Sequence, residues 1–307
     1  MEKKASVVFF GSPAFSVPSL RALLQAGFQV PLVITKPDAP RGRGLRPAPS
    51  AVKQAALEAG LRVLEPQRLT EEAFLQELDR PDFLAVVAYG KILPQEVLQV
   101  PRVAPVNLHA SLLPKYRGAA PIPWAILQGE DKTGLTTIWM STEMDAGDVL
   151  LQEEVPILQE DTAGTLSERL SHLGAGLLVR TLEGLLSGQV RPRPQEGRPS
   201  FAPPLKKEDG HIRWERPAAE LERFIRAMNP WPGAFCHLGG RRLKLLRAQA
   251  LQGRAQPGQL LKAEGQLLVG TGQGLLRILE LQPEGKRPMK AEEFLRGRAV
   301  RGAEVLR

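Results

Sequence analysis

The first 34 residues constrain the fold most, because they read as a strand, a helix and a second strand in direct succession. Residues 6–10 are an apolar run, apolar residues recur at helical spacing across residues 17–24, and residues 30–34 are apolar again. Two strands joined by a helical crossover lie parallel, so the sequence predicts an α/β fold with a mostly parallel sheet. The turn after the first run lacks the G-x-G-x-x-G pattern, so we expect no dinucleotide cofactor.

A further strand is predicted at residues 106–109, where two apolar residues alternate with Asn107 and His109. Side chains alternate across a strand, so the carboxamide and the imidazole share one face. Pro114 cannot continue the strand because it has no backbone N–H to donate. Loops that leave the carboxyl ends of strands are where open α/β sheets bind ligands, so we expect a functional site here.

A carboxylate follows on a turn at residues 144–148, Met-Asp-Ala-Gly-Asp, between two β-rich segments that we expect to pair as antiparallel strands. Asn107, His109 and Asp145 would together provide an oxyanion donor, a proton shuttle and an acid that orients or charges the shuttle. Acyl transfer to an amine needs these groups. A histidine on a strand is more often a hydrogen-bonded packing residue, and that alternative stays open at this point.

These two motifs resemble those of a known family. The run N-x-H-x-S-L-L-P-x-x-R-G-x-A-P at residues 107–121, followed by D-x-G-D at residues 145–148, is similar to the formyltetrahydrofolate-dependent formyltransferases, and the similarity covers nearly all of the chain. The resemblance implies transfer of the formyl group of 10-formyltetrahydrofolate to the α-amino group of methionine on initiator tRNA, for translation initiation. It implies that Asn107 is the oxyanion donor, His109 the proton shuttle and Asp145 its orienting acid, with no metal.

The resemblance also assigns binding residues. The loop after His109 would frame the folate, and the segment after the apolar run 83–88 would line its pocket. The expected folate-binding residues are Ser111, Leu112, Leu113, Pro114, Tyr89, Gly90, Ile92 and Leu93. The cationic loop at residues 36–49 is too rich in proline and glycine for regular structure, and it resembles the family's loop that enters the acceptor end of the tRNA. The expected tRNA-binding residues are Arg41, Arg43, Arg46, Lys206, Lys207, Arg241 and Arg242.

Positive charge is concentrated in the last third of the chain. Residues 200–307 hold 20 Lys and Arg against 11 Asp and Glu, whereas residues 1–199 hold 21 against 22. Such an excess is typical of a polyanion-binding module, although a merely solubilising surface is the alternative. We therefore expect a Rossmann-like catalytic domain at residues 1–186, a proline-rich linker at 187–209 and a smaller basic OB-like β-barrel domain for tRNA at 210–307.

The remaining expectations concern the cell and the competing functions. One cysteine, Cys236, excludes an intrachain disulfide, and we expect a cytoplasmic monomer with no membrane partner.

Thr165 and Glu168 form a capping-box pattern that predicts a helix start at Thr165, continuing to Leu186 and covering the sheet. A glycinamide ribonucleotide formyltransferase or a formyltetrahydrofolate hydrolase would use the same three catalytic residues. An RNA-binding protein with a degenerate transferase domain is the alternative from another class.

Overall fold

The computed structural model describes residues 5–41, 46–263, 265–296 and 305–306. The chain forms two compact units. The first unit comprises Met1–Pro121, Lys132–Pro156 and Ser167–Pro203, and the second comprises Ile122–Asp131, Ile157–Leu166 and Pro204–Arg307.

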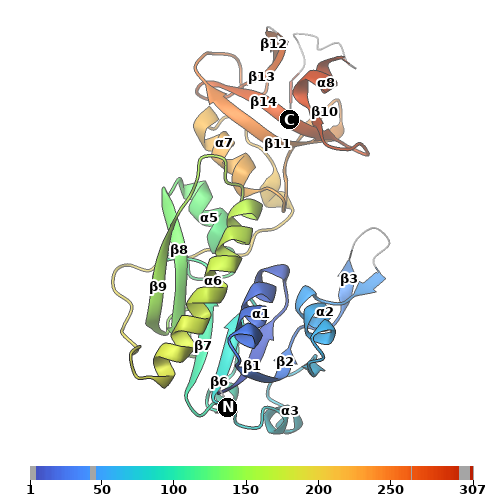
Figure 1. The fold of residues 1–307 in the computed structure, drawn as a ribbon. Helices are drawn as coiled ribbons and strands as arrows, with labels where there is room; N and C mark the ends of the chain where they lie inside the picture. The colour runs from blue at the N-terminus through green and yellow to red at the C-terminus, as the bar shows by residue number, and fades with distance from the viewer. Residues whose placement is uncertain (1–4, 42–45, 264, 297–304, 307) are drawn as a thin grey trace. The chain divides into compact units, whose positions relative to one another are not determined.

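A seven-stranded sheet forms the centre of the first unit (Figure 1). Its strands are β1 (Ser6–Gly11), β2 (Gln29–Ile34), β5 (Val63–Leu64), β6 (Phe83–Val87), β7 (Ala104–His109), β8 (Lys132–Trp139) and β9 (Asp148–Pro156). The strand order is β5-β2-β1-β6-β7-β8-β9, parallel as far as β7 and antiparallel in the last two pairs. The expected mostly parallel sheet and the antiparallel pairing across residues 144–148 are confirmed. The order reverses between β1 and β6, and ligands bind beside such switch points in open sheets.

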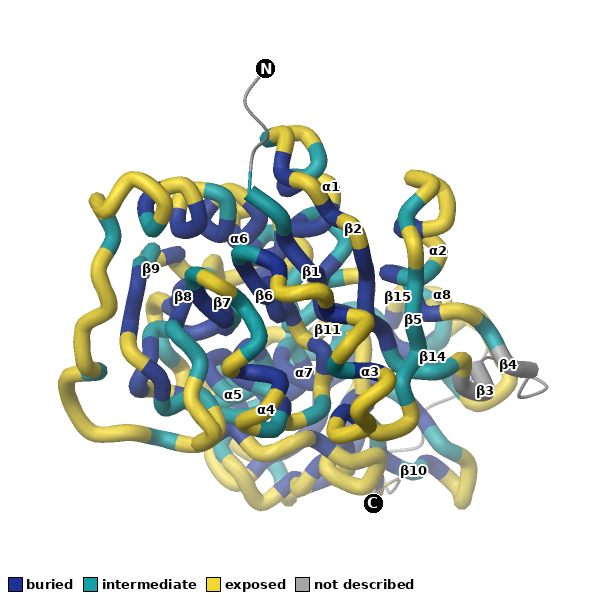
Figure 2. Tube along the Cα trace, turned by 90° about the horizontal axis from the view of Figure 1, so that it is seen from below, coloured by how far each residue is buried: buried dark blue, intermediate teal, exposed yellow. Residues whose placement is uncertain are grey.

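Helices cover both faces of this sheet. They are α1 (Val17–Gln25), α2 (Ala51–Glu58), α3 (Glu72–Glu77), α4 (Gln95–Leu98) and most of α6 (Ala163–Leu186), with a 3-10 turn at Ala14–Ser16. Figure 2 shows α1 and α6 on one side of the strands and α3 and α4 on the other. A Cβ at Gly174 of α6 would lie 2.7 Å from Leu108 Cδ2, so α6 packs directly against the apolar face of β7. The prediction that this helix covers the sheet is confirmed.

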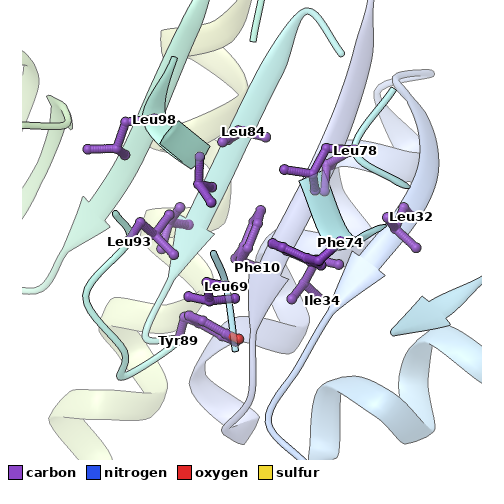
Figure 3. Packing of buried hydrophobic residues seen from close by; sticks show 13 residues of the cluster. Phe10, Leu32, Ile34, Leu69, Phe74, Leu78, Leu84, Tyr89, Leu93 and Leu98 are labelled. Carbon is purple, nitrogen blue, oxygen red and sulfur yellow. The ribbon is translucent and has the colours of Figure 1, made fainter. Parts of the chain in front are cut away.

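The opposite face of the sheet carries a cluster of buried side chains (Figure 3). Phe10 and Val86 contribute to it from β1 and β6, and Phe74 contributes from α3. Asn107 lies beside Val86 in the parallel register of β6 and β7. Neighbouring residues in register point to the same face, so Asn107 and His109 lie on the face that carries this cluster, away from α6.

Two local expectations were wrong. Helix α6 begins at Ala163, because Thr162 caps it: Thr162 Oγ1 accepts from Thr165 N at 3.2 Å, and Thr165 Oγ1 accepts from Thr162 N at 3.0 Å. Thr165 therefore occupies the third helical position of a reciprocal box, a place that Glu or Gln usually holds. The cationic loop also contains regular structure, since β3 (Ala39–Arg41) and β4 (Arg46–Ala48) pair as a short antiparallel ribbon.

The proline-rich segment after α6 is packed against the first unit as far as Pro203. Arg193 exchanges two backbone hydrogen bonds with Val149 at 2.7 and 2.9 Å, and Ala202 N donates to Arg117 O at 2.7 Å. The segment expected as a proline-rich linker, residues 187–209, therefore makes backbone hydrogen bonds to the first unit at Arg193 and Ala202. Proline-rich composition marks a segment without helix, but its backbone can still bond to a sheet edge.

The second unit contains an antiparallel sheet of six strands. They are β10 (Ala234–Leu238), β11 (Arg241–Leu251), β12 (Leu260–Ala263), β13 (Gln266–Gly270), β14 (Leu275–Pro283) and β15 (Met289–Lys290). The order is β10-β11-β14-β13-β12, with β15 on β14. Its helices are most of α5 (Pro121–Gln128), α7 (Ala218–Ala227) and α8 (Ala291–Arg296), with a 3-10 turn at Glu208–Gly210. Helix α7 buries Leu221, Phe224 and Ile225, and the expected small antiparallel β domain is confirmed.

Candidate active site

The structure brings Asn107, His109 and Asp145 together over one face of β7. Asn107 Nδ2 donates to Asp145 Oδ1 at 3.4 Å, and His109 Nδ1 lies 3.5 Å from Asp145 Oδ2. Both distances are long, as is common for catalytic groups before substrate tightens the site. The side chains of His109 and Asp145 are 7% and 13% exposed, so their mutual electrostatic interaction is weakly screened by water.

The turn that carries Asp145 is folded back over β7. Asp145 has φ +51°, a left-handed conformation that few residues other than glycine adopt. Only glycine fits at position 147, because a Cβ there would lie 1.9 Å from the backbone oxygen of Trp139. Asp145 Oδ2 accepts a hydrogen bond from Gly118 N at 2.8 Å. The carboxylate is thus fixed by the loop that follows His109 as well as by its own turn.

His109 is oriented by a backbone carbonyl. Its Nε2 lies 2.9 Å from Tyr116 O. A carbonyl oxygen only accepts, so Nε2 carries the hydrogen and donates. In the neutral ring Nδ1 then holds the lone pair, and Nδ1 is the nitrogen that faces Asp145. The nitrogen able to take up a proton therefore lies beside the carboxylate that can stabilise the resulting positive charge.

The loop expected to frame the folate is held by hydrogen bonds within itself, to β8 and to the proline-rich segment. Ser111 Oγ is fully buried and donates to Lys115 O at 2.6 Å, and Leu113 N donates to Thr136 Oγ1 at 3.2 Å. Leu112 packs against β8, and Pro114 O accepts from the proline-rich segment. These four residues give the loop a fixed shape, and the hydroxyl hydrogen of Ser111 is already used in the bond to Lys115 O.

The four residues expected to line the folate pocket after β6 divide into two pairs. Tyr89 and Leu93 belong to the buried cluster, where the Tyr89 ring meets Phe10 edge to face at 5.4 Å (Figure 3). Burial raises the pKa of the Tyr89 hydroxyl to about 12. Ile92 is 72% exposed, and Gly90 is exposed with φ +72°. A ligand at this edge of the sheet would therefore contact the exposed Gly90 and Ile92, whereas the side chains of Tyr89 and Leu93 pack in the buried cluster.

Lys36 lies beside Gly90 at this edge of the sheet, and the sequence analysis did not name it. It is the second residue after β2, and its Nζ lies 2.5 Å from where a Cβ on Gly90 would stand. Burial lowers the pKa of Lys36, and the charge of Lys91 lowers it further. A lysine just after a buried apolar strand was the available signal, because it places an ammonium group at the carboxyl edge of the sheet.

The expected tRNA-binding residues are placed as follows. Arg43 lies outside the described residues, and only the backbones of Arg41 and Arg46 are described, opposite each other in the β3–β4 ribbon.

In the second unit Lys206, Lys207 and Arg241 are exposed. Arg242 stacks its guanidinium 3.6 Å above the ring of Phe235, which holds the group by a cation–π contact.

The described residues contain no group of three or more His, Cys, Asp or Glu side chains placed to hold a metal ion. None of the helices in the described part of the chain is long and apolar enough to cross a membrane.

Comparison with known proteins gives a consistent result over both units. Residues 3–182 match the family model for formyl transferase, and residues 204–299 match the model for the formyl transferase C-terminal domain. The chain is 46% identical to a methionyl-tRNA formyltransferase of Thermodesulfovibrio yellowstonii, over 96% of this chain and 97% of that protein. It is 49% identical to a methionyl-tRNA formyltransferase of Pelotomaculum thermopropionicum, over 95% of each chain. HypX from Aquifex aeolicus, solved with tetrahydrofolic acid, shares the fold at a TM-score of 0.65 and 19% identity, over 96% of this chain and 47% of HypX.

Proposed function

The chain belongs to the formyl transferase family, and we propose that it transfers the formyl group of 10-formyltetrahydrofolate to the α-amino group of methionine esterified to initiator tRNA. The observation that carries this proposal is the convergence of Asn107, His109 and Asp145 on one face of β7. Asn107 supplies a hydrogen-bond donor for the oxyanion, His109 supplies a proton acceptor, and Asp145 supplies the negative charge beside the protonated imidazole. The names of the relatives, both methionyl-tRNA formyltransferases, indicate the acceptor.

The reaction exchanges one bond for another at the formyl carbon. The neutral amine attacks that carbon, a new N–C bond forms, and the bond from the carbon to the folate N10 breaks. One proton leaves the amine and one reaches N10, so protons and electrons balance. The α-amino group has a pKa of about 8, so roughly a tenth of it is neutral at pH 7, and a proton acceptor is useful but need not be strong.

Each of the three residues has a task that follows from its geometry. Asn107 Nδ2 donates to the formyl oxygen as negative charge develops there; its contact with Asp145 is long and readily exchanged. His109 takes up the proton of the amine at Nδ1, because Nε2 is held by the Tyr116 carbonyl, and then delivers it to N10. Asp145 stabilises the imidazolium that exists between the two proton transfers.

The two units divide the work in this proposal. The first unit, which holds all three reacting side chains, carries the chemistry and the folate, with Gly90, Ile92 and the loop at residues 111–114 nearest to it. The second unit, which contains most of the basic excess, binds the tRNA through phosphate contacts. Arg43, in the cationic loop of the first unit, contacts the acceptor end of the tRNA. The tRNA acceptor supports a cytoplasmic location, and we propose that the protein acts as a monomer.

The test is direct transfer. Purified protein is given 10-formyltetrahydrofolate labelled in the formyl group together with methionyl initiator tRNA, and the released amino acid is analysed for N-formylmethionine. Uncharged initiator tRNA serves as the control without an acceptor amine, and glycinamide ribonucleotide serves as an alternative acceptor. Labelled formylmethionine supports the proposal. Labelled formate without an acylated acceptor would identify a hydrolase, and labelled glycinamide ribonucleotide would identify a purine-synthesis transferase.

A further inference from the structure

Gln195, in the proline-rich segment after α6, joins the two parts of the candidate active site through its side chain. Its Oε1 accepts from Arg117 Nη2 at 2.7 Å and from Arg117 Nε at 3.2 Å. Its Nε2 donates to Asp145 O at 2.7 Å and to Gly147 O at 2.8 Å. A carboxamide has two donor hydrogens and two acceptor lone pairs, so this one side chain is fully used.

The partners of Gln195 are the two segments that position the reacting groups. Arg117 lies between Tyr116, whose carbonyl orients His109, and Gly118, whose N–H holds the Asp145 carboxylate. The carbonyls of Asp145 and Gly147 belong to the turn that presents that carboxylate. Gln195 therefore fixes the distance between the loop that holds His109 and the turn that carries Asp145.

The backbone around Gln195 is itself anchored. Two residues earlier, Arg193 pairs with Val149 at the start of β9, and further on Ser200 Oγ accepts from Tyr116 N at 2.9 Å. Asp145 sits in a left-handed conformation, which persists only where its surroundings determine it strongly. The two hydrogen bonds from Gln195 Nε2 are part of what determines it.

We propose that Gln195 is a positioning residue for formyl transfer, which acts by holding Asp145 against Asn107 and His109. This inference rests on the proposed function. Glutamic acid would keep the contact with Arg117 but would set a carboxylate against the two turn carbonyls, which can only accept. Asparagine is one methylene shorter. Of these three side chains, only glutamine can accept two hydrogen bonds from the Arg117 guanidinium and also donate to the two turn carbonyls.

The test uses Gln195→Ala and Gln195→Glu in the full chain, with Gln189→Ala as the matched control, an exposed glutamine of the same segment. Misplacing a reacting group by about 1 Å reduces catalysis by up to about 100-fold, so we expect kcat to fall about 10- to 100-fold in both variants. The KM for formyltetrahydrofolate should stay within about threefold, because the folate-facing residues are elsewhere. The control should keep wild-type kcat.

A double-mutant cycle separates positioning from general structural support. If Gln195 acts through the carboxylate of Asp145, Gln195→Ala should lower kcat little further in an Asp145→Asn protein, because the interaction it serves is already lost. Equal losses in both backgrounds would overturn the proposal, as would a kcat of Gln195→Ala and Gln195→Glu within about twofold of wild type. A wild-type protein that forms no formylmethionine would instead refute the proposed function, and the positioning role with it.

Discussion

Replacement of Asn107 by alanine separates the chemical role of its side chain from any structural role. The contact of its Nδ2 with Asp145 Oδ1 is 3.4 Å, beyond the usual range of about 2.7–3.2 Å for a hydrogen bond from nitrogen to oxygen. Removing it should lower the free energy of unfolding by less than about 1 kcal/mol. Loss of an oxyanion donor, by contrast, raises the barrier by about 2.7–4 kcal/mol, which reduces kcat roughly 100- to 1,000-fold.

The assay measures formylation of methionyl initiator tRNA at saturating concentrations of both substrates, alongside denaturant unfolding of the same preparation. The chain's other asparagine provides a matched control, since Asn229 Nδ2 donates to Leu246 O at 3.2 Å in the second unit. Asn229→Ala deletes the same group and one hydrogen bond, so it should lose stability while its kcat stays near wild type. A kcat for Asn107→Ala within about threefold of wild type would refute the oxyanion role.

Four further predictions follow from the local structure and charge pattern. Gly147→Ala should reduce kcat about 10- to 100-fold, since its Cβ would overlap the Trp139 carbonyl and displace the turn; unchanged kcat and Tm would contradict this. Thr162→Ala should lower the unfolding free energy by about 1 kcal/mol in denaturant titration, and Thr162→Ser should restore it. Burial raises the pKa of the Cys236 thiol to about 12, which favours the unreactive protonated form, so a thiol reagent near pH 8 should label the unfolded chain and spare the native one. Arg43→Ala should weaken methionyl-tRNA use more than folate binding, by a factor that shrinks as salt is added; equal losses would contradict a tRNA contact.

The parts of the fold that sequence predicted correctly are those set by short-range rules. Strand alternation alone placed Asn107 and His109 on a shared face, and the helical crossover alone required parallel strands. The same rules placed Asp145 on a turn between antiparallel strands. They did not show that this turn folds back over β7, because that depends on Gly147 meeting the backbone of β8.

The start of α6 was predicted wrongly because side-chain chemistry admitted two solutions. A threonine can be the N-cap residue before a helix, or it can be the third helical residue whose side chain bonds back to the N-cap N–H. Thr162 has the first role and Thr165 the second, within one reciprocal pair. Tyr89 and Leu93 follow a strand that ends at the ligand-binding edge, so sequence favoured a pocket role for them. The structure buries both side chains in the cluster that contains Phe10, and their place in the folate pocket stays a prediction.

Gln195 shows why a site cannot be completed from sequence even when its reacting residues can. Its side-chain partners lie 48 to 78 positions away along the chain, so no local period or spacing connects them. The surrounding prolines indicated a spacer, since they remove backbone donors and forbid a helix. Yet proline leaves the carbonyls and the neighbouring N–H groups available, and Arg193 uses its own to pair with β9. That pairing brings a neutral carboxamide against the turn that carries Asp145. A positively charged side chain there would be repelled by the guanidinium of Arg117, and a carboxylate would face two carbonyl oxygens that cannot donate to it. The geometry of Asp145 thus depends on a segment whose composition indicated only a linker between two domains.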